Sequence, residues 1–521
     1  MATIDKSQAK DRPRSSDQGR VIAFLSSPDS HAGAAVEVIH THCSVIFLAG
    51  ERAYKLKRAV KFPFLDYSTL DLRQTACEKE VVLNRRTAPE IYLGTCPIVE
   101  TPDGGLALDG VGRPVEWVVV MQRFSQSGLF SQMAAKQKLT AGLLKKLARQ
   151  IADFHRRAAS RPEMGGAAEM HHLATDNSLD LRRAAPEIWS MDRVVALEKA
   201  TLSEIDRYRK LLDNRRRSGH VRLCHGDLHL RNICLIDGRP TLFDAIEFDE
   251  KIACIDVLYD LAFLLMDLEA QNLRSFANIV VNEYLAETGD WQGVKLLPLF
   301  MSIRAAIRAK VSEAAAAYAC GDEEKSLHDE ARHFFELAEK LLCQHSGRVI
   351  AIAGLSGSGK STVAASVAPR LGASPGAILI KSDVLRKQKF AVPQKTTLSQ
   401  SAYTKKVSQE IYRQLGELTL GLAVCGFTVI ADAAFLQEDE RIALEQNASA
   451  FNIDFSGLWI DVSPGVQDQR LRDRVGDVSD ATVEVGQTQR NYNLGNLSWV
   501  HLDGDRSINE VTNAALTLLI P

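Results

Sequence analysis

The sequence lacks the features of a secreted, membrane-spanning or disulfide-stabilised chain. No apolar run approaches the roughly 18–20 residues that a membrane-crossing helix needs. The first twenty residues are polar, without the apolar segment of a signal peptide. None of the nine cysteines forms a CxxC pair or a zinc-ligand spacing, which predicts reduced thiols. We therefore expect a cytoplasmic protein that does not interact with membranes.

The chain also lacks an excess of charge of either sign. Its 63 basic and 65 acidic residues give a formal net charge of −2. Such a near-neutral balance gives no support for a nucleic-acid partner. With 45% hydrophobic and 25% charged residues, the composition is that of an ordinary globular protein. Its 521 residues are enough for roughly two to four domains.

Two stretches of different pattern follow the polar start. Residues 1–20 are expected to be a disordered tail. Residues 21–345 mix strands, as in CSVIFLAGERAYKLK, with amphipathic helices at 70–86, 139–159 and 296–343. After the polar HSGR, strands alternate with helices, which is typical of a parallel sheet. We predict an α+β domain over residues 21–345 and an α/β domain over residues 346–521.

The segment HGDLHLRN and the later FDAIEF carry the residue types that phosphoryl transfer from ATP requires. One group must accept the proton of the attacking hydroxyl, and oxygen ligands must hold Mg²⁺ against the phosphates. Asp227 suits the first role, as the catalytic base. Asn232 and Asp244 suit the second, because Mg²⁺ prefers carboxylate and amide oxygens.

This spacing resembles the catalytic loop of protein kinases, with His-Gly-Asp in place of His-Arg-Asp. It is similar to the aminoglycoside phosphotransferase and choline-kinase branch of that fold. The whole chain resembles bacterial proteins that fuse such a domain to a P-loop kinase-like domain. The resemblance implies that Lys55, on a strand through RAYKLK, binds the nucleotide phosphates. It also implies a helix glutamate beside that lysine, for which Glu80 is preferred and Glu78 is the alternative.

Three more residues lie near this motif in the sequence. His229 and Glu247 either shape the site or are a packing residue and a solvated carboxylate. Asp260 is expected to anchor the catalytic loop by hydrogen bonds rather than to take part in chemistry. One departure from the kinase pattern is the missing G-x-G-x-x-G loop before the lysine strand, where HTHCSVIFLAG stands instead. That departure keeps a pseudokinase interpretation open.

The segment GLSGSGKS matches the pattern G-x-x-x-x-G-K-[ST] completely, between the apolar strand VIAIA and a helical STVAASV. Glycines let backbone N–H groups converge on phosphates, and the helix N-terminus adds partial positive charge. Lys360 is expected to reach the β- and γ-phosphates, and the Ser361 hydroxyl to bind Mg²⁺. The predicted nucleotide-binding residues of this loop are Gly354, Ser356, Gly357, Ser358, Gly359, Lys360, Ser361 and Thr362.

Strand ends and a downstream helix add candidates to this second site. Asp432, which ends FTVIAD, is predicted to be the Walker-B carboxylate that holds Mg²⁺. The segment IKSDVLRK resembles the substrate segment of zeta-toxin-like and gluconate-kinase-like P-loop kinases. That resemblance implies that Asp383 orients or deprotonates the acceptor hydroxyl, unless it is a helix N-cap, and that Arg386 contacts an anionic group. RLRDR resembles a lid whose arginines stabilise the transferring phosphoryl group, unless they form a solvated helical face; the candidates there are Arg470 and Arg474, with Arg441 as a weaker one.

Together these patterns predict an ATP-dependent kinase with an Mg²⁺–ATP site in each half. Its acceptors would be small hydroxylated molecules such as a sugar, an aminoglycoside-like compound or an amino alcohol. A second interpretation is an ATP-binding regulatory protein or ATPase in which one or both sites are non-catalytic. A third is an oligomeric AAA-type motor. It is disfavoured because only about 160 residues follow Lys360, with no separate helical domain evident.

Overall fold

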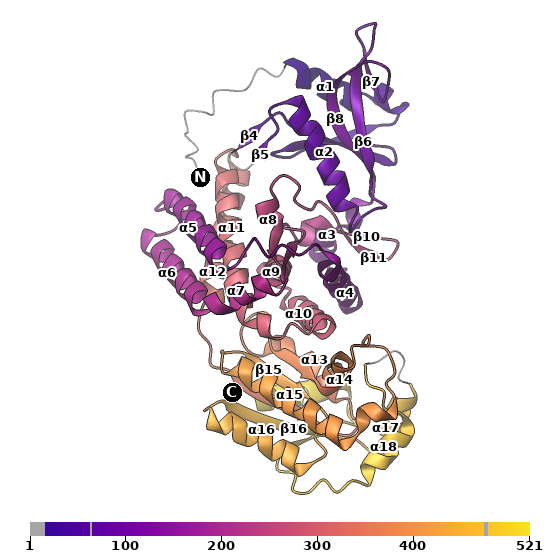
Figure 1. The fold of residues 1–521 in the computed structure, drawn as a ribbon, viewed down its shortest axis with the longest axis vertical. Coiled ribbons are helices and arrows are strands. Elements are labelled where there is room, and N and C mark those ends of the chain that lie inside the picture. The colour runs from indigo at the N-terminus through magenta and orange to yellow at the C-terminus, as the bar shows by residue number, and fades with distance from the viewer. Residues whose placement is uncertain (1–15, 63–64, 474–477, 521) are drawn as a thin grey trace. The chain divides into compact units, whose positions relative to one another are not determined.

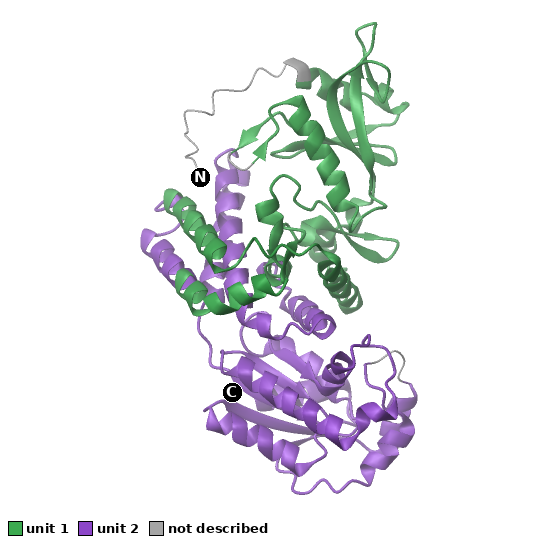
Figure 2. Ribbon diagram, in the orientation of Figure 1, with its two compact units in different colours: residues 1–183, 202–264 green, residues 184–201, 265–521 purple. Residues whose placement is uncertain are grey.

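The computed structural model describes residues 16–62, 65–473 and 478–520 (Figure 1). By their contacts they form two compact units: unit 1 comprises residues 1–183 and 202–264, and unit 2 comprises residues 184–201 and 265–521 (Figure 2). The expected boundary near residue 346 falls between the last helix before the second sheet, α12 (Asp322–Leu341), and β13 (Arg348–Ala353). As a domain boundary it stays a prediction.

An antiparallel six-stranded sheet begins unit 1, with the order β1-β2-β3-β8-β6-β7. Its strands are β1 (Val36–His40), β2 (Ser44–Ala49), β3 (Arg52–Lys57), β6 (Tyr92–Glu100), β7 (Leu106–Leu108) and β8 (Arg113–Gln122). The expected hairpin around Gly50 is present as β2 and β3, in which Ile46 lies opposite Lys55. The helix α2 (Leu70–Asn84) packs against β6 and β8. It therefore carries its buried side chains to the sheet that holds Lys55.

The first helix, α1 (Ser16–Ser26), begins inside the segment for which the sequence predicts a disordered tail. Val21 and Leu25 are buried against the sheet. The side-chain amide of Gln18 donates to the carbonyl of Lys57 at 2.9 Å. Residues 16–20 are helical in the structure, where the sequence predicts a disordered tail. Residues 1–15 lie outside the described residues.

Helices and short strands complete unit 1 around the predicted catalytic loop. The loop lies between β9 (Val221–Leu223) and the hairpin of β10 (Ile233–Ile236) and β11 (Arg239–Leu242). After α8 (Glu250–Ala253), β12 (Cys254–Asp256) pairs with β9. The helix α9 (Val257–Ala270) follows β12, and most of its apolar residues are buried. The remaining elements before the loop are β4 (Lys61–Phe62), β5 (Leu65–Asp66), α3 (Phe130–Ala135), α4 (Ala141–Arg157), α5 (Ala167–Ala184), α6 (Met191–Arg207) and α7 (Arg209–Arg217). Residues 191–201 of α6 and residues 265–270 of α9 belong to unit 2.

Unit 2 contains helices followed by a five-stranded parallel sheet with the order β14-β15-β13-β16-β17. The parallel α/β fold predicted for this part is confirmed. Before the sheet come α10 (Arg274–Thr288), α11 (Leu297–Ala316) and α12. The strands after β13 are β14 (Ile378–Lys381), β15 (Thr428–Asp432), β16 (Asp454–Asp461) and β17 (Val500–Asp503). The helices between and after them are α13 (Lys360–Val367), α14 (Ser382–Lys389), α15 (Lys405–Ala423), α16 (Glu438–Ala450), α17 (Pro464–Arg472), α18 (Val483–Arg490) and α19 (Ile508–Leu519).

The order of the strands in this sheet places the predicted site residues at one edge. Carboxyl ends of parallel strands lie side by side, and ligands bind there. The strand β13 leads into the glycine loop, β15 ends at Asp432, and β14 ends at Lys381. Asp432 lies opposite Ile352 on one side and opposite Lys381 on the other.

No helix in residues 16–62, 65–473 and 478–520 combines the length and the apolar character that a bilayer crossing requires. All nine cysteines are free thiols in the structure.

Candidate active sites

Lys55 on β3 joins two carboxylates that come from distant parts of unit 1. Its Nζ lies 2.8 Å from Oε1 of Glu80 on α2 and 2.6 Å from Oδ1 of Asp244. Burial lowers the pKa of Lys55, but the two carboxylates outweigh this and raise it well above its usual value. Of the two predicted partners, Glu80 faces the lysine, whereas Glu78 is exposed and accepts a hydrogen bond from Gln74.

A second lysine reaches the same glutamate. Lys57 lies on the same face of β3 as Lys55 and is 2% exposed. Its ammonium group forms ion pairs with Oε2 of Glu80 and Oε1 of Glu247. The Tyr67 hydroxyl donates to Glu247 at 2.8 Å. Glu247 is therefore paired inside the protein, which excludes the solvated-carboxylate interpretation, and Lys57 is a residue to which the sequence pattern assigned no role.

The charges of these lysines set the protonation of Glu80. Complete burial alone raises the pKa of this carboxyl, but Lys55 and Lys57 outweigh burial and lower it. The pKa of Lys57 is raised, because its two carboxylate partners outweigh its own burial. All three groups are thus held in their charged forms near neutral pH.

The catalytic loop brings Asp227 and Asn232 together. The Asn232 side-chain amide donates to Oδ2 of Asp227 at 2.8 Å and to the Asp227 carbonyl at 3.0 Å. Because its nitrogen is engaged in this way, its oxygen is the atom left for a metal ion. Nε2 of His229 lies 3.3 Å from Oδ2 of Asp227, which favours the interpretation that His229 shapes the site.

Asp260 holds the backbone of this loop, as the sequence predicts. Its Oδ1 accepts from the Gly226 amide at 2.9 Å, and its Oδ2 accepts from the His225 amide at 3.0 Å. Nε2 of His155 on α4 lies 3.1 Å from the same Oδ2. Gly226 has φ +84°, so the residue beside Asp227 adopts a conformation that glycine favours.

The buried ring of His225 lies behind the predicted catalytic loop. Burial lowers the pKa of His225, while the charges of Asp260, Asp227 and Asp244 raise it in part. The net shift is downward, so the ring is neutral, and it lies 3.0 Å from the Phe243 carbonyl through Nε2. Asp227 and Asp244 therefore act on one ring from two different segments.

Asp244 itself is held in a strained backbone conformation. Its φ is +63°, in the left-handed region that non-glycine residues rarely adopt. The Asp244 amide donates to the Tyr92 hydroxyl at 3.0 Å, and the next amide, of Ala245, donates to Oδ1 of Asn84 at 2.8 Å. Sequence reasoning missed Tyr92 and Asn84, because they lie more than 150 residues away and no local pattern marks them.

These residues fit a magnesium ion. The side chains of Asp227 and Asp244 are 37% and 42% exposed, so their oxygens can be reached from outside. Two carboxylates and an amide oxygen are the ligand types that Mg²⁺ prefers. The predicted metal ligands Asn232 and Asp244 are thus gathered near Asp227 and Lys55.

The glycine loop of unit 2 connects β13 to α13, as its sequence predicts. Gly354 has φ +143°, and a Cβ there would lie 2.7 Å from the Ile460 carbonyl. A helix N-terminus offers backbone amides to an anion; in α13 the Thr362 and Val363 amides both donate to the Gly359 carbonyl at 3.0 Å. The loop is fixed from outside, since the Ser356 amide donates to Gln489 of α18 at 2.8 Å and its carbonyl accepts from Gln467 of α17 at 2.7 Å.

Asp432 is the buried carboxylate of this second site. It is 3% exposed, and neither oxygen reaches a hydrogen-bond partner in the described structure. Burial raises the pKa of Asp432, and the charges of Lys381 and Lys360 oppose that rise. The Ser361 hydroxyl also lowers this pKa, although the pair does not meet hydrogen-bond geometry. An unpaired buried carboxylate beside a hydroxyl suits a divalent cation.

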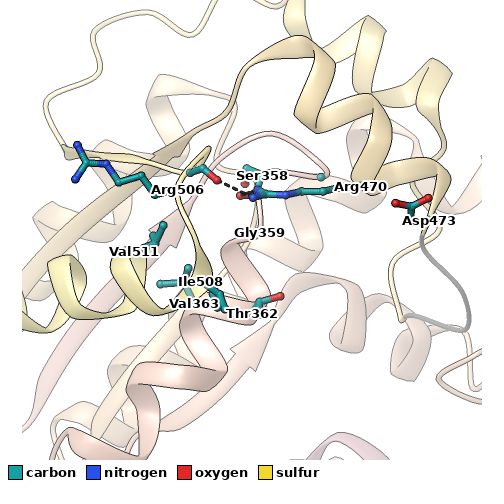
Figure 3. Close-up of a pocket in the computed structure, with 11 residues that line it drawn as sticks. Ser358, Gly359, Thr362, Val363, Arg470, Asp473, Arg506, Ile508 and Val511 are labelled. Carbon is teal, nitrogen blue, oxygen red and sulfur yellow. Dashed lines mark hydrogen bonds between the residues drawn. The ribbon is translucent and has the colours of Figure 1, made fainter.

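Arg470 borders an open cavity of about 380 Å³ beside the glycine loop (Figure 3). Its guanidinium donates to the Ser358 carbonyl at 3.1 Å and to the Gly504 carbonyl at 2.7 Å. Glycine-loop residues that line the cavity are Gly357, Ser358, Gly359 and Thr362. Arg470 therefore lies next to the loop, as expected, whereas Arg474 lies outside the described residues.

Asp383 and Arg386, both on α14, lie in different surroundings. Asp383 lies in the first turn of α14, whose N-cap is Lys381, so Asp383 is not the cap. Its charge raises the pKa of Asp432, Tyr403 and Tyr412, although it is not the main cause. The expectation that Arg386 contacts a substrate anion is wrong in this structure, because it is buried, donates to the Ala402 carbonyl at 2.6 Å and lies over the Tyr403 ring.

Arg441 is likewise an internal residue. Arg441 is 2% exposed, and its guanidinium donates to the carbonyls of Phe435 and Asn496, both at 2.8 Å. These bonds occupy the donors that a phosphoryl group would need, so the weaker candidate for a lid arginine is a structural one. Sequence reasoning missed Lys381, whose position at the end of β14 was the available signal.

Comparison with known proteins matches each half to a different family. Residues 118–297 match the phosphotransferase enzyme family, and residues 349–493 match an AAA domain. The predicted succession of an aminoglycoside-phosphotransferase-like domain and a P-loop domain is thereby confirmed. Two kinase-like domains support a phosphotransferase or ATP-binding role.

The whole chain also has relatives of similar length. Uncharacterized proteins of Mycobacterium tuberculosis and Mycobacterium bovis are 29% identical over 460 residues, covering 86% of this chain and 88% of theirs. The similarity to these relatives therefore extends over most of both chains.

Solved structures resemble separate parts of the chain. A choline/ethanolamine kinase family protein from Mesorhizobium loti is 12% identical with a TM-score of 0.38, covering 62% of this chain and 95% of that one. A gluconokinase from Sinorhizobium meliloti is 22% identical with a TM-score of 0.25, covering 34% of this chain and 93% of that one. A sugar kinase from a Janibacter species is 23% identical with a TM-score of 0.27, covering 34% and 96%.

Proposed function

We propose that this protein is an ATP-dependent phosphotransferase with an independent Mg²⁺–ATP site in each half, both acting on small hydroxylated substrates. The observation that carries the proposal is the double contact of Lys55 with Glu80 and Asp244. It joins a strand lysine, a helix glutamate and a metal-loop aspartate beside the catalytic loop of Asp227. A pseudokinase would not need all of these groups in one place.

In the first site, different residues bind the nucleotide, orient the lysine and accept the proton during phosphoryl transfer. Lys55 holds the α- and β-phosphates, and Glu80 keeps that lysine oriented. Asp227 accepts the proton of the acceptor hydroxyl, while Asn232 and Asp244 hold Mg²⁺. When bound, Mg²⁺ supplies positive charge against the phosphates. A sugar or an amino alcohol offers the hydroxyl that such a site requires.

In the second site, the amides of the glycine loop and Lys360 bind the phosphates, and Asp432 with Ser361 holds Mg²⁺. Asp383 orients or deprotonates the acceptor hydroxyl, and Arg470, which lines the cavity beside the glycine loop, stabilises the transferring phosphoryl group. The cavity beside Gly359 is within the size of ordinary small-ligand pockets, roughly 300–1,000 Å³. Nothing in this site requires a group from the first.

The test uses full-length Asp227→Asn and Lys360→Met with labelled ATP and a panel of sugars, gluconate, choline, ethanolamine and an aminoglycoside. Each change should remove one acceptor-dependent activity, by roughly a thousandfold or more, and leave the other. Exposed Asp71→Asn and Lys395→Met are the matched controls, with both activities retained.

Two other outcomes would contradict the proposal. Nucleotide binding without any phosphorylated product, across the panel and a metabolite extract, would indicate the ATP-binding regulator. Acceptor-independent hydrolysis that depends steeply on protein concentration would indicate an oligomeric motor.

A further inference from the structure

The strand β14 lies at the edge of the parallel sheet and leads directly to Asp383 on α14. An edge strand exposes N–H and C=O groups that no neighbouring strand pairs. The side of β14 that faces away from β15 is therefore not held by hydrogen bonds within the sheet.

Two asparagines of α10 supply the missing pairing on that side. Oδ1 of Asn282 accepts from the Leu379 amide at 2.7 Å, and its Nδ2 donates to the Ala377 carbonyl at 3.2 Å. One side-chain amide thus binds the N–H of Leu379 in the strand and the C=O of Ala377 just before it, as a neighbouring strand would. Nδ2 of Asn278 also donates to the Ala377 carbonyl, at 3.0 Å, and to the Pro375 carbonyl, at 3.1 Å.

Side chains that follow Asp383 in the sequence bind the C-terminal end of α10 in turn. The last carbonyls of a helix have no partner within it. Nε2 of Gln388, on α14, donates to the Ala286 carbonyl at 2.9 Å, and Nε2 of Gln394 donates to the same carbonyl at 2.7 Å. The Trp291 indole donates to Oε1 of Gln388 at 3.2 Å.

The backbone is shaped for this close approach. Gly376 has φ +101°, and a Cβ there would lie 2.7 Å from Nδ2 of Asn278. Asn278 and Asn282 are 2% and 9% exposed. The bonds are therefore shielded from water, where an unpaired polar group is costly.

We propose that α10, which lies before the predicted boundary at residue 346, is part of the second acceptor site. Asn278 and Asn282 are positioning residues that hold β14, and through it Asp383, in place. The inference rests on the proposed function of the second site. It distinguishes acceptor positioning from nucleotide binding in that site. The bonds given above for Asn278 and Asn282 go to residues 375–379, next to Asp383, and not to the glycine loop at 354–361.

The experiment uses the full chain in the Asp227→Asn background, which silences the first site. Asn282→Leu removes the bonds to Leu379 and Ala377, and Asn282→Asp keeps the acceptor for Leu379. Asn447→Leu, at an exposed position of α16, is the matched control. Amide exchange over residues 377–390, the affinity for a fluorescent ATP analogue, and transfer to gluconate and the sugars of the panel are measured.

We expect exchange over residues 377–390 to rise by roughly tenfold or more in Asn282→Leu, with a smaller rise in Asn282→Asp and none in the control. Nucleotide affinity should stay within about twofold, while the ratio kcat/KM for the acceptor falls by about tenfold. A merely structural role would instead weaken nucleotide binding and transfer together.

The proposal is overturned if exchange over this segment does not change, or if it rises while acceptor kinetics stay as in the parent. Absence of transfer in the parent chain to every acceptor would refute the proposed function of the second site. In that case the exchange and affinity measurements still decide whether Asn282 holds the segment.

Discussion

Replacing Lys57 by methionine tests the buried charge network behind the first site. The network contains Lys55 and Lys57 with Glu80, Asp244 and Glu247, so its formal charge is −1 and becomes −2 in Lys57→Met. The side chains of Lys57 and Glu247 are only 2% and 6% exposed. Glu247 keeps the Tyr67 hydroxyl as a partner but loses its cation.

Removing one partner of a buried ion pair costs about 3–5 kcal/mol, because the other charge stays buried. The protein has two units, so one global transition does not report unit 1. The free energy of local opening is therefore taken from amide exchange in β3 and α2. Lys55 keeps both of its carboxylates in Lys57→Met, so nucleotide affinity should fall less than in Lys55→Met.

A double-mutant cycle decides whether the pair, rather than side-chain packing, is responsible. Lys57→Met with Glu247→Gln removes both charges, and its opening free energy should exceed that expected from the two single changes by about 1–3 kcal/mol. Strictly additive effects, or a Lys57→Met variant with parental exchange, would refute the reasoning. Glu78→Gln on the exposed side of α2 should leave exchange and turnover unchanged.

Three further results are expected for unit 2. Asp432→Asn should raise the Mg²⁺ concentration needed for half-maximal turnover at the second site by roughly tenfold or more, measured by titration, with the first site unaffected. Gly354→Ala should abolish nucleotide-analogue binding at that site and cost about 1–3 kcal/mol in unit 2, because its Cβ would meet the Ile460 carbonyl. Burial raises the pKa of Glu440 to about 7, so the folded protein retains a proton that the unfolded chain releases above about 4.3. The stability of unit 2 should therefore fall as pH rises from about 5 to 7. This dependence on pH should flatten in Glu440→Gln, measured as the free energy of local opening from amide exchange in α16.

The two kinase motifs were readable from the amino-acid sequence because each is local. In HGDLHLRN and GLSGSGKS the chemical groups belong to one turn of the chain, so their spacing alone brings them together. The alternation of strands and helices after residue 346 likewise predicted a parallel sheet, whose geometry puts Asp432 beside the glycine loop. The same-face spacing of Lys55 and Lys57 was visible in the strand pattern.

Tertiary structure decided which of several similar residues meet. Glu80 rather than Glu78 pairs with Lys55 because α2 turns that face toward the sheet. Lys57 and Glu247 are 190 residues apart, and no periodicity links them. Arg386 and Arg441 resemble site arginines in sequence, but packing surrounds them with backbone carbonyls.

The attachment of α10 to β14 also belongs to tertiary structure. Its asparagines and glutamines are ordinary polar residues in sequence, and only the approach of a helix to a strand edge gives them backbone partners. Local motifs therefore determine which chemistry the chain carries, since covalent spacing places their atoms. Long-range packing determines which side chains orient those atoms, since that depends on the face each element buries.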